Sequence, residues 1–307
     1  MYVAAIDLGG TKTVAAVCTE NGDILQKLKF PTEVSDMNAH FDACVSHLEE
    51  CFDRAGISSR DVSGLGITLP GMADGNGNLI YAPFAGWRNV PVCRIFAEKT
   101  GIGNVRADND VNACAIAETY FCGVKNHFWV TVSTGIGGAP VIDGKLCRGY
   151  GNVAGELGHV KVEYENGRLC SCGQRGCAEA HASGTAIGKM TAEAALTDPE
   201  FASLCRGVFD AKTCADLARK GNAVALEIMN TAGDRLGRAI ACAVNLFNPE
   251  KVIIGGGVAL SLDLLMPAIR RRLISDAVAS AQNTPVEMTK LGYDAGLLGA
   301  AALILQQ

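Results

Sequence analysis

Apolar blocks alternate with polar stretches along the chain, and their spacing predicts strands and helices in turn. Apolar runs of strand length occupy residues 3–6 and 14–17, and residues 24–30 are predicted to form a third strand. Asn21-Gly22, between the second and third runs, is a strong hairpin signal. A helix ending near Gly56 follows, and its apolar stripe consists of Phe41, Val45, Leu48 and Phe52. The start of the chain therefore predicts a strand meander followed by a helix.

The second half of the chain repeats this plan. Strands are predicted at residues 128–132, 140–142 and 252–254, with a glycine-rich loop over 133–138 and a turn at Asp143-Gly144. Further helices are predicted at residues 111–121, 222–247 and 297–305, the second of them stopped by Asn248-Pro249. Strands that alternate with helices indicate an α/β architecture. The recurrence of strand, glycine turn and strand also predicts an internal duplication, although many α/β proteins contain such a unit.

Three glycine-rich segments each follow an apolar strand, at residues 7–13, 133–138 and 255–257. In the first, Gly9 and Gly10 allow close approach of phosphate, Thr11 offers a hydroxyl and Lys12 a cation, while Asp7 could hold Mg²⁺. No Walker loop is present. The second segment runs into a strand and not into a helix, which makes a nicotinamide-binding enzyme a weak alternative. An ordinary glycine-rich turn is the other alternative, and the three segments together favour nucleotide binding.

Acidic residues gather at a predicted strand-to-helix junction. Asp108, Asn109 and Asp110 precede the helix at 111–121, where a carboxylate could accept the proton of a hydroxyl nucleophile during phosphoryl transfer. Helix capping by Asp108 or Asp110 is the competing interpretation, since Asp and Asn are favoured at N-caps.

Three of the thirteen cysteines form a cluster with the spacing C-x-C-x4-C, at Cys170, Cys172 and Cys177. A closed tetrahedral zinc site needs a fourth ligand, for which His159 is the best candidate and His181 the next. Chance clustering and a zinc-ribbon nucleic-acid module are the alternatives, but the segment lacks a second thiolate pair and basic surroundings.

Two glutamates, Glu156 and Glu179, lie close in sequence to these ligands. A zinc ion would fix them relative to each other, and paired carboxylates suit the vicinal hydroxyls of a sugar. Solvated surface glutamates are the alternative. The other ten cysteines fit small buried residues in a reducing compartment.

The net charge and the hydropathy of the chain limit the kinds of partner that it is expected to bind. The formal net charge is −5, which argues against nucleic acid and against an anionic membrane surface. Mean hydropathy is +0.19, but no apolar run reaches the roughly 18 residues that a membrane span requires. Residues 1–10 lack the features of a signal peptide, so we expect a cytoplasmic protein.

In seven segments the chain resembles the ROK family of sugar kinases and sugar-responsive repressors. These segments are residues 7–12, Leu69-Pro70-Gly71, residues 109–112, 134–138, 155–159, 170–179 and Gly255-Gly256-Gly257. Their order along the chain is the family order. Departures from the usual pattern are Val111, Ala139, Ala178, His181 and the absence of a frequent Asn near Phe84-Ala85-Gly86-Trp87. These departures bear on sugar identity and not on the reaction.

The resemblance implies a two-lobed actin-like ATPase fold, of ribonuclease H type, with a cleft between the lobes and a structural zinc loop. The smaller lobe would comprise residues 1–118 with the last helix, 296–307, packed back on it, and the larger lobe residues 119–295 with the zinc loop and dimerisation helices. Asp110 would be the general base. The implied sugar contacts are Gly71, Asn109, Asp110, Glu156, His159 and Glu179. The implied ATP contacts are Asp7, Gly9, Gly10, Thr11, Lys12, Thr134, Gly135, Gly137, Gly256 and Gly257. The implied zinc ligands are His159, Cys170, Cys172 and Cys177.

The activity implied by the resemblance is ATP-dependent phosphorylation of a hexose, with glucose at its 6-hydroxyl as the leading substrate, Mg²⁺ with ATP, and a homodimer. Fructose, N-acetylmannosamine, N-acetylglucosamine and allose are alternative substrates, because epimers differ by the direction of one hydroxyl. A transcription repressor is disfavoured because the glycine loop begins at Asp7, which leaves no room for a DNA-reading region, and because Asp110 is present. A noncatalytic sugar sensor is the third hypothesis.

Overall fold

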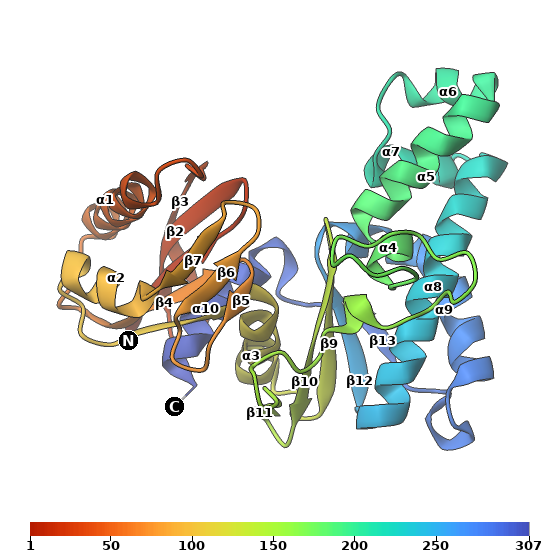
Figure 1. Cartoon of the computed structure of the whole chain (residues 1–307). Coiled ribbons are helices and arrows are strands. Elements are labelled where there is room, and N and C mark those ends of the chain that lie inside the picture. The colour runs from red at the N-terminus through yellow and green to blue at the C-terminus, as the bar shows by residue number, and fades with distance from the viewer. Residues whose placement is uncertain (307) are drawn as a thin grey trace. The chain divides into compact units, whose positions relative to one another are not determined.

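The computed structural model describes residues 1–306 and divides them into two compact units (Figure 1). Of the described residues, the first unit contains 1–125, 143–154 and 290–306, and the second contains 126–142 and 155–289. These units differ from the expected lobes at residues 119–125, 143–154 and 290–295, which all lie in the first unit. None of the helices in residues 1–306 combines the length and the apolar composition that crossing a membrane requires.

The first unit is built on a sheet with the strand order β3-β2-β1-β4-β8. Its strands are β1 (Tyr2–Leu8), β2 (Lys12–Thr19), β3 (Ile24–Pro31), β4 (Val62–Leu69) and β8 (Val105–Asn109). Strands β1, β2 and β3 form an antiparallel meander, whereas β4 and β8 run parallel to β1. A small antiparallel sheet adds β5 (Met72–Ala73), β6 (Leu79–Ala82) and β7 (Trp87–Val90). Beyond these, the unit contains α1 (Met37–Ala55), α2 (Val92–Thr100), α3 (Asp110–Cys122), β11 (Lys145–Leu146), η4 (Gly292–Asp294) and α10 (Ala295–Leu305).

Alternation along β1 explains why helices cover both faces of this sheet. Ala4, Ile6 and Leu8 belong to the core that includes residues of α1 and α2, whereas Val3 and Ala5 pack with α10. The packing of α10 on β4 is close, since a Cβ atom on Gly66 would lie 1.7 Å from the carbonyl oxygen of Ala300. Both faces of β1 are therefore buried, and Asp7 lies one residue before the end of this buried strand.

The strands of the second unit pair in the order β10-β9-β12-β13. They are β9 (His127–Val132), β10 (Ile136–Ile142), β12 (Lys251–Gly255) and β13 (Val286–Met288). Strand β10 is antiparallel to β9, and β12 and β13 run parallel to β9, as in the β2-β1-β4-β8 part of the first sheet. This shared topology supports the internal duplication that the sequence predicts.

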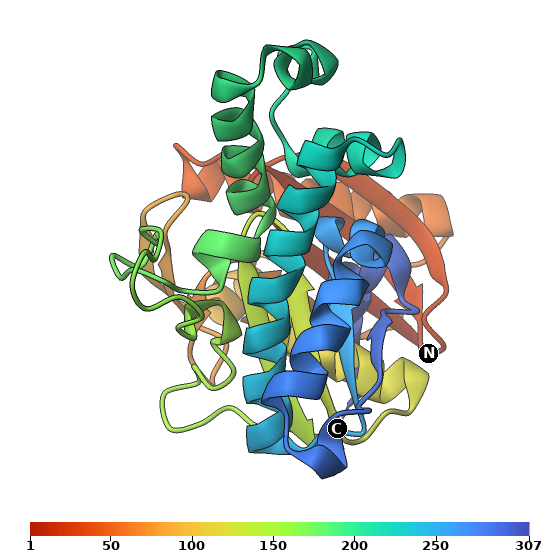
Figure 2. The ribbon, with the colours of Figure 1, turned by 90° about the vertical axis from the view of Figure 1, so that its right-hand side faces the viewer.

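The helices of the second unit are η1 (Leu157–His159), α4 (Glu179–Ala182), α5 (Gly184–Thr197), α6 (Pro199–Cys205), α7 (Ala211–Arg219), α8 (Ala223–Phe247), η2 (Gly257–Ser261), α9 (Leu262–Asp276) and η3 (Ala279–Ala281). Helices α8 and α9 run side by side (Figure 2), and a Cβ atom on Gly233 of α8 would lie 2.7 Å from the Leu265 carbonyl oxygen of α9. Asn222 caps the start of α8, and Asn248 follows its last residue in a left-handed conformation, so the helix ends at the predicted stop.

One predicted loop is shorter than expected. Strand β10 begins at Ile136, so Gly137 and Gly138 lie in a strand and pair with Thr131 and Val130. The loop prediction over residues 133–138 was wrong for its second half, because pairing with β9 outweighs the low strand propensity of glycine. The loop that remains is Ser133–Gly135.

Candidate active site

The glycine loop between β1 and β2 exposes backbone donors. The N–H of Gly9 donates to the Lys12 carbonyl at 3.1 Å, which closes a tight turn, and a Cβ atom on Gly9 would lie 2.6 Å from that oxygen. Within residues 1–306, the N–H groups of Gly10 and Thr11 form no hydrogen bond. Unpaired N–H groups on a glycine turn are the donors that a phosphate oxygen requires.

Asp7 and Lys12 flank this loop with opposite charges. Thr68 donates a hydrogen bond of 2.6 Å to the Asp7 carboxylate, while burial raises the pKa of Asp7 above its ordinary value. The Lys12 ammonium contacts the Tyr293 hydroxyl and lies 4.7 Å from the centre of the Tyr293 ring. That hydrogen bond raises the pKa of Lys12 and lowers the pKa of Tyr293. The loop therefore has a carboxylate on one side and a fixed cation on the other.

Asp110 is the first residue of α3, immediately after β8. Asn109 is the N-cap, and its side-chain oxygen accepts from the N–H groups of Val111 at 2.9 Å and Asn112 at 3.3 Å. Burial, followed by the negative charge of Asp7, raises the pKa of Asp110 to about 6. A carboxylate with a pKa of about 6 is a stronger base than an ordinary aspartate and is still ionised at neutral pH.

Gly71 joins Asn109 and Asp110 in the same part of the first unit. The Asn109 amide donates a 2.8 Å hydrogen bond to the Gly71 carbonyl oxygen. Gly71 has a φ of 122°, and a Cβ atom there would lie 2.4 Å from the Tyr81 carbonyl oxygen. The turn after β4 therefore requires glycine, and it brings the three predicted sugar-contact residues of this unit together.

Asp108 has a different role from the capping that the sequence left open. Its carboxylate accepts from the Asn109 N–H at 2.8 Å and from the Asn112 side chain at 3.1 Å, and it forms a 2.6 Å ion pair with Arg148. Asp108 is 2% exposed, so this pair is largely removed from water on the carboxylate side. Asp108 therefore links the start of α3 to the segment 143–154.

In the second unit, Glu179 holds the short loop after β9. Its carboxylate accepts from the Ile136 N–H at 3.1 Å and from the Ser171 hydroxyl at 2.8 Å. A Cβ atom on Gly135 would lie 2.5 Å from one Glu179 oxygen, so the carboxylate packs closely on the loop backbone there. Glu179 thus connects the predicted phosphate loop to the cysteine segment.

Four side chains in the second unit form a candidate metal centre. The ligand atoms of His159, Cys170, Cys172 and Cys177 all lie within 4.8 Å of one another. Zinc–sulfur bonds of about 2.3 Å in a tetrahedron place two sulfurs about 3.8 Å apart. The Sγ atoms of Cys172 and Cys177 are 3.8 Å apart, and Nδ1 of His159 lies 3.7 Å from Sγ of Cys170. The spacing and the donor set fit a zinc ion.

His159 is the histidine of this cluster, and His181 is not. Nε2 of His181 accepts from the Arg168 N–H at 3.1 Å, and its ring is buried. In His159 the Nδ1 atom faces the thiols, while Nε2 lies 3.9 Å from the Glu156 carboxylate. Glu156 is exposed. Glu156 lies three residues before His159, so a metal ion that holds His159 would also restrict the position of Glu156.

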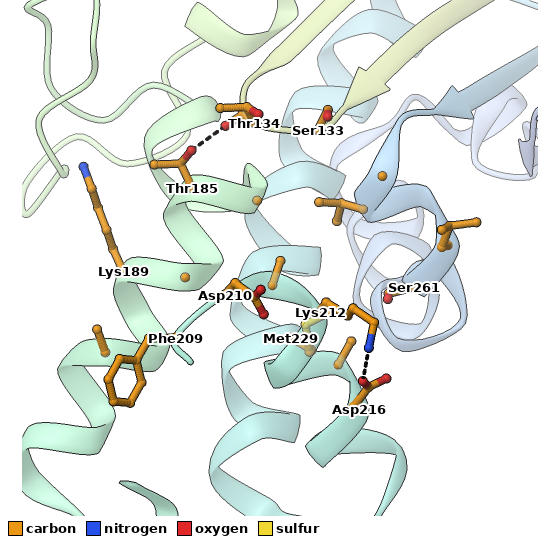
Figure 3. Close-up of a pocket in the computed structure, with 18 of the residues that line it drawn as sticks. Ser133, Thr134, Thr185, Lys189, Phe209, Asp210, Lys212, Asp216, Met229 and Ser261 are labelled. Carbon is orange, nitrogen blue, oxygen red and sulfur yellow. Dashed lines mark hydrogen bonds and ion pairs between the residues drawn. The ribbon is translucent and has the colours of Figure 1, made fainter. Parts of the chain in front are cut away.

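A cavity of about 800 Å³ lies in the second unit (Figure 3). Thr134 and Gly257, both predicted nucleotide contacts, line it. Gly256, just outside the lining, has a φ of 92°, and a Cβ atom there would lie 2.5 Å from the Val132 carbonyl oxygen. Thr185 donates a 2.8 Å hydrogen bond to the Thr134 carbonyl oxygen and so joins the loop to α5. The cavity brings together the second and third glycine segments.

Helices α5 and α7 form walls of this cavity. These walls were not predicted from the sequence. The polar residues on these walls are Thr185, Lys189, Asp210, Lys212, Asp216 and Arg219. Lys212 and Asp216 pair at 2.7 Å, and Arg219 binds Asp263 at 2.8 Å. The only signal in the sequence is the small residues Gly184, Gly188 and Ala192 at helical spacing on α5, which leave room beside the helix.

Comparison with known proteins agrees with this arrangement. The family model described as "ROK family" matches residues 3–307. A glucokinase of Thermotoga maritima is 36% identical over 100% of this chain and 98% of its own length. A putative xylose repressor of a Caldicellulosiruptor species is 32% identical over 84% of this chain and 66% of its own length. The crystal structure of a ROK family glucokinase from Streptomyces griseus, in complex with glucose and AMPPNP, superposes with a TM-score of 0.86 at 32% identity, with 100% of both chains covered. The chain belongs to the ROK family.

Proposed function

We propose that the protein is an ATP-dependent sugar kinase that phosphorylates glucose at its 6-hydroxyl. The observation that carries the proposal is Asp110, a carboxylate with a pKa of about 6 that is fixed at the first position of α3. Glucokinases that match over the full chain support the same reaction. A base of this strength can accept the proton of a sugar hydroxyl as that oxygen attacks phosphorus.

Each unit carries polar groups that would bind sugar hydroxyls. Asn109, whose side chain is already held by Gly71, would offer hydrogen bonds near the reacting hydroxyl. Glu156 and Glu179 would bind the remaining hydroxyls as acceptors, because carboxylates accept hydrogen bonds from vicinal hydroxyls, and Nε2 of His159 would donate to a sugar oxygen, because zinc on Nδ1 leaves the hydrogen on Nε2. The proton of the attacking oxygen would pass to the Asp110 carboxylate, and the hydroxyl oxygen would form its new bond to the γ-phosphorus of ATP while ADP leaves.

ATP binding would use the three glycine segments. In the first unit, Gly9, Gly10, Thr11 and Lys12 would face phosphate oxygens, and the N–H groups of Gly10 and Thr11 are available for this. In the second unit, the cavity lined by Thr134 and Gly257 would accept the adenosine. Gly135, Gly137 and Gly256, which lie close in sequence to these two residues, would also contact ATP. Mg²⁺ bound with ATP would neutralise charge on the phosphates, and Asp7 is the carboxylate that would hold it.

Zinc would be structural in this proposal. His159, Cys170, Cys172 and Cys177 give a Cys3His set with no open position, so the ion would hold the segment that carries Glu156 and Glu179. We also propose that the protein works in a reducing compartment, the cytoplasm, where the three cluster cysteines can bind a metal as thiolates. We also propose a homodimer, to be measured by sedimentation.

A phosphorylation screen tests the proposed function. The purified protein is incubated with Mg²⁺ and ATP and with each of about a dozen sugars, and ADP release is coupled to NADH oxidation. We expect the highest kcat/KM with glucose and formation of glucose 6-phosphate, identified by NMR. Preference for fructose, allose or an N-acetylhexosamine would change the substrate but keep the reaction. No sugar-dependent ADP release with any of them would contradict the kinase proposal.

A repressor is the second candidate, because xylose repressors are among the matching relatives. Asp110 favours the kinase, since a sugar-sensing repressor needs no base at this position. A gel-shift experiment at 150 mM salt with fragments of the native operon distinguishes the two. Sugar-sensitive binding to a specific fragment would support the repressor.

A further inference from the structure

A buried chain of hydrogen bonds ends on the glycine loop of the first unit. Nε2 of His40 lies 3.0 Å from the Thr13 hydroxyl, and the Thr13 hydroxyl lies 2.9 Å from the Thr32 hydroxyl. The Thr32 hydroxyl in turn donates to the Gly9 carbonyl oxygen at 2.7 Å. We call His40, Thr13 and Thr32 the His40 relay. Its three members come from α1, β2 and the residue after β3.

Only one assignment of hydrogen atoms satisfies the His40 relay. A carbonyl oxygen cannot donate, so the single hydroxyl hydrogen of Thr32 points to Gly9. Thr32 must then accept from Thr13, and Thr13 must accept from His40, which places a hydrogen on Nε2 of the imidazole. The Glu33 N–H donates to Nδ1 of the same ring at 3.3 Å, so Nδ1 carries no hydrogen. His40 is therefore neutral, in the Nε2–H tautomer.

The His40 relay is buried among largely apolar side chains, which makes each of its hydrogen bonds necessary. His40 is 1% exposed and Thr13 is 0% exposed. The imidazole is enclosed by the rings of Phe30, Phe41 and Trp87, whose centres lie 5.9 to 6.5 Å from its own. Cys44 Sγ, 3.7 Å from Nε2, offers only a weak acceptor. A hydrogen-bonding group left unpaired in such a site is costly, so each member of the relay holds the next.

The end of the relay acts on the orientation of one peptide group. In a trans peptide the carbonyl oxygen and the next N–H point in opposite directions, so fixing the Gly9 carbonyl also fixes the direction of the Gly10 N–H. Glycine on both sides makes rotation of this peptide inexpensive, so the loop conformation needs an external anchor. The Thr32 N–H also donates to the Thr11 carbonyl oxygen at 3.1 Å. Thr32 thus holds the loop on both sides of Gly10.

We propose that His40, Thr13 and Thr32 are positioning residues for ATP, which aim the Gly10 N–H at a phosphate oxygen by locking the Gly9–Gly10 peptide. The proposal rests on the proposed function, because it requires the glycine loop to bind phosphate. The relay touches neither substrate. It acts through the backbone of the loop, and its loss would weaken the use of ATP without affecting the binding of glucose.

The substitution Thr32→Val tests this directly, since it removes the hydroxyl while keeping the shape of the side chain. We expect KM for ATP to rise about tenfold, the effect of one lost hydrogen bond to a loop, with KM for glucose within twofold of the wild type. Thr32→Ser restores the hydroxyl and should restore KM for ATP. Thr100→Val is the matched control, because Thr100 donates to the Phe96 carbonyl within α2. An unchanged KM for ATP in Thr32→Val, or equal impairment in Thr32→Ser, overturns the proposal.

A measurement on the unmodified protein covers the case in which Thr32→Val fails to fold. The ¹⁵N resonances of the five histidines are recorded at pH 7.5, and His40 is assigned through His40→Gln. We expect the Nε2–H tautomer, and a shift of both ring nitrogens on addition of Mg·ADP. The Nδ1–H tautomer, or no response to the nucleotide, overturns the proposal. Absence of ATP-dependent glucose phosphorylation by the wild type is a separate result, which removes the proposed function instead.

Discussion

Asp110 combines a helix N-terminal position with a nearby negative charge, and the two act in opposite directions on its pKa. The helix dipole and the Val111 N–H, at 3.0 Å, favour the carboxylate, whereas burial and Asp7 favour the neutral acid. Burial and Asp7 prevail, and the pKa of Asp110 is raised to about 6. Half of the carboxyl groups are therefore ionised one unit below neutral pH, which suits a group that must both accept and release a proton.

This pKa predicts the pH dependence of the reaction. The base must be ionised, so kcat/KM for glucose should fall about tenfold per pH unit below a midpoint near pH 6, the value given by the pKa of Asp110. Asp110→Asn should reduce kcat by about 10²- to 10⁴-fold at every pH and should abolish this dependence. The measurement is the pH–rate profile of both proteins, with Asp53→Asn on the exposed side of α1 as the control. Near-normal turnover by Asp110→Asn would remove Asp110 from the role of base.

The same substitution should not impair folding. A carboxyl whose pKa is raised on folding, from 3.8 to about 6, contributes stability that is fully present below pH 3.8 and is lost as the pH rises through 6. The ionised group is thus unfavourable at pH 7, by up to about 3 kcal/mol from the size of the shift. The neutral Asn should therefore leave the melting temperature unchanged or raise it, and a loss of activity can be attributed to chemistry.

At the scale of elements, the segment from η1 to α4 has little regular structure of its own. Residues 160–178 contain only two isolated bridges, Lys161 with Cys177 and Leu169 with Arg175. Glu179 at the start of α4 nevertheless joins this segment to the start of β10, because its carboxylate accepts from the Ser171 hydroxyl and from the Ile136 N–H. A cross-link through His159 and the three cysteines would therefore replace the backbone pairing that the segment lacks.

Loss of a cluster thiol should remove both the ion and the sugar affinity. In Cys172→Ser we expect less than one tenth of the zinc content of the wild type, measured by mass spectrometry of the metal. We also expect KM for glucose to rise about 10- to 100-fold, because Glu156 and Glu179 lose their anchor. Cys242→Ser is the matched control, since Cys242 is an exposed cysteine of α8 outside the cluster. Undiminished glucose binding by metal-free protein would contradict a structural role for zinc.

Elements with local signals were predictable, and those decided by distant pairing were not. Helix α8 has an apolar stripe, an Asn cap at each end and a following proline, so its bounds follow from the sequence. Strand β10 begins earlier than expected because Gly137 and Gly138 pair with β9, which no local pattern reveals. The cysteine cluster was predictable because its ligands lie within nineteen positions of one another, from His159 to Cys177. The cavity walls were not, because α5, α7 and η2 are separated in sequence.

At the scale of the whole chain, the two units share one sheet topology but differ in the helices that cover the sheet. The first unit buries both faces of β1 with helices of moderate length. The second adds α5, α6 and α7 before the long helix α8, and α5 and α7 form walls of the 800 Å³ cavity. Segment 143–154 belongs to the first unit although it follows β10 in sequence, since Arg148 pairs with Asp108 and Asn152 donates to the Ala73 carbonyl oxygen.

This difference between the units predicts which segments a bound nucleotide protects from hydrogen exchange. With a non-hydrolysable ATP analogue at about 100 times its Kd, a ligand bound only to the closed form of these segments contributes about 2.7 kcal/mol, or a roughly 100-fold slowing of exchange through the local openings that release it. We expect this slowing at residues 184–192, 211–219 and 257–261, which contain the cavity walls. The polar cavity of the first unit, lined by Arg106, Asp143 and Lys145, serves as the internal reference and should not respond. Hydrogen exchange read by mass spectrometry checks both regions at once. Protection around Arg106 and Lys145 without protection of α5 and α7 would move the nucleotide out of the cavity of the second unit.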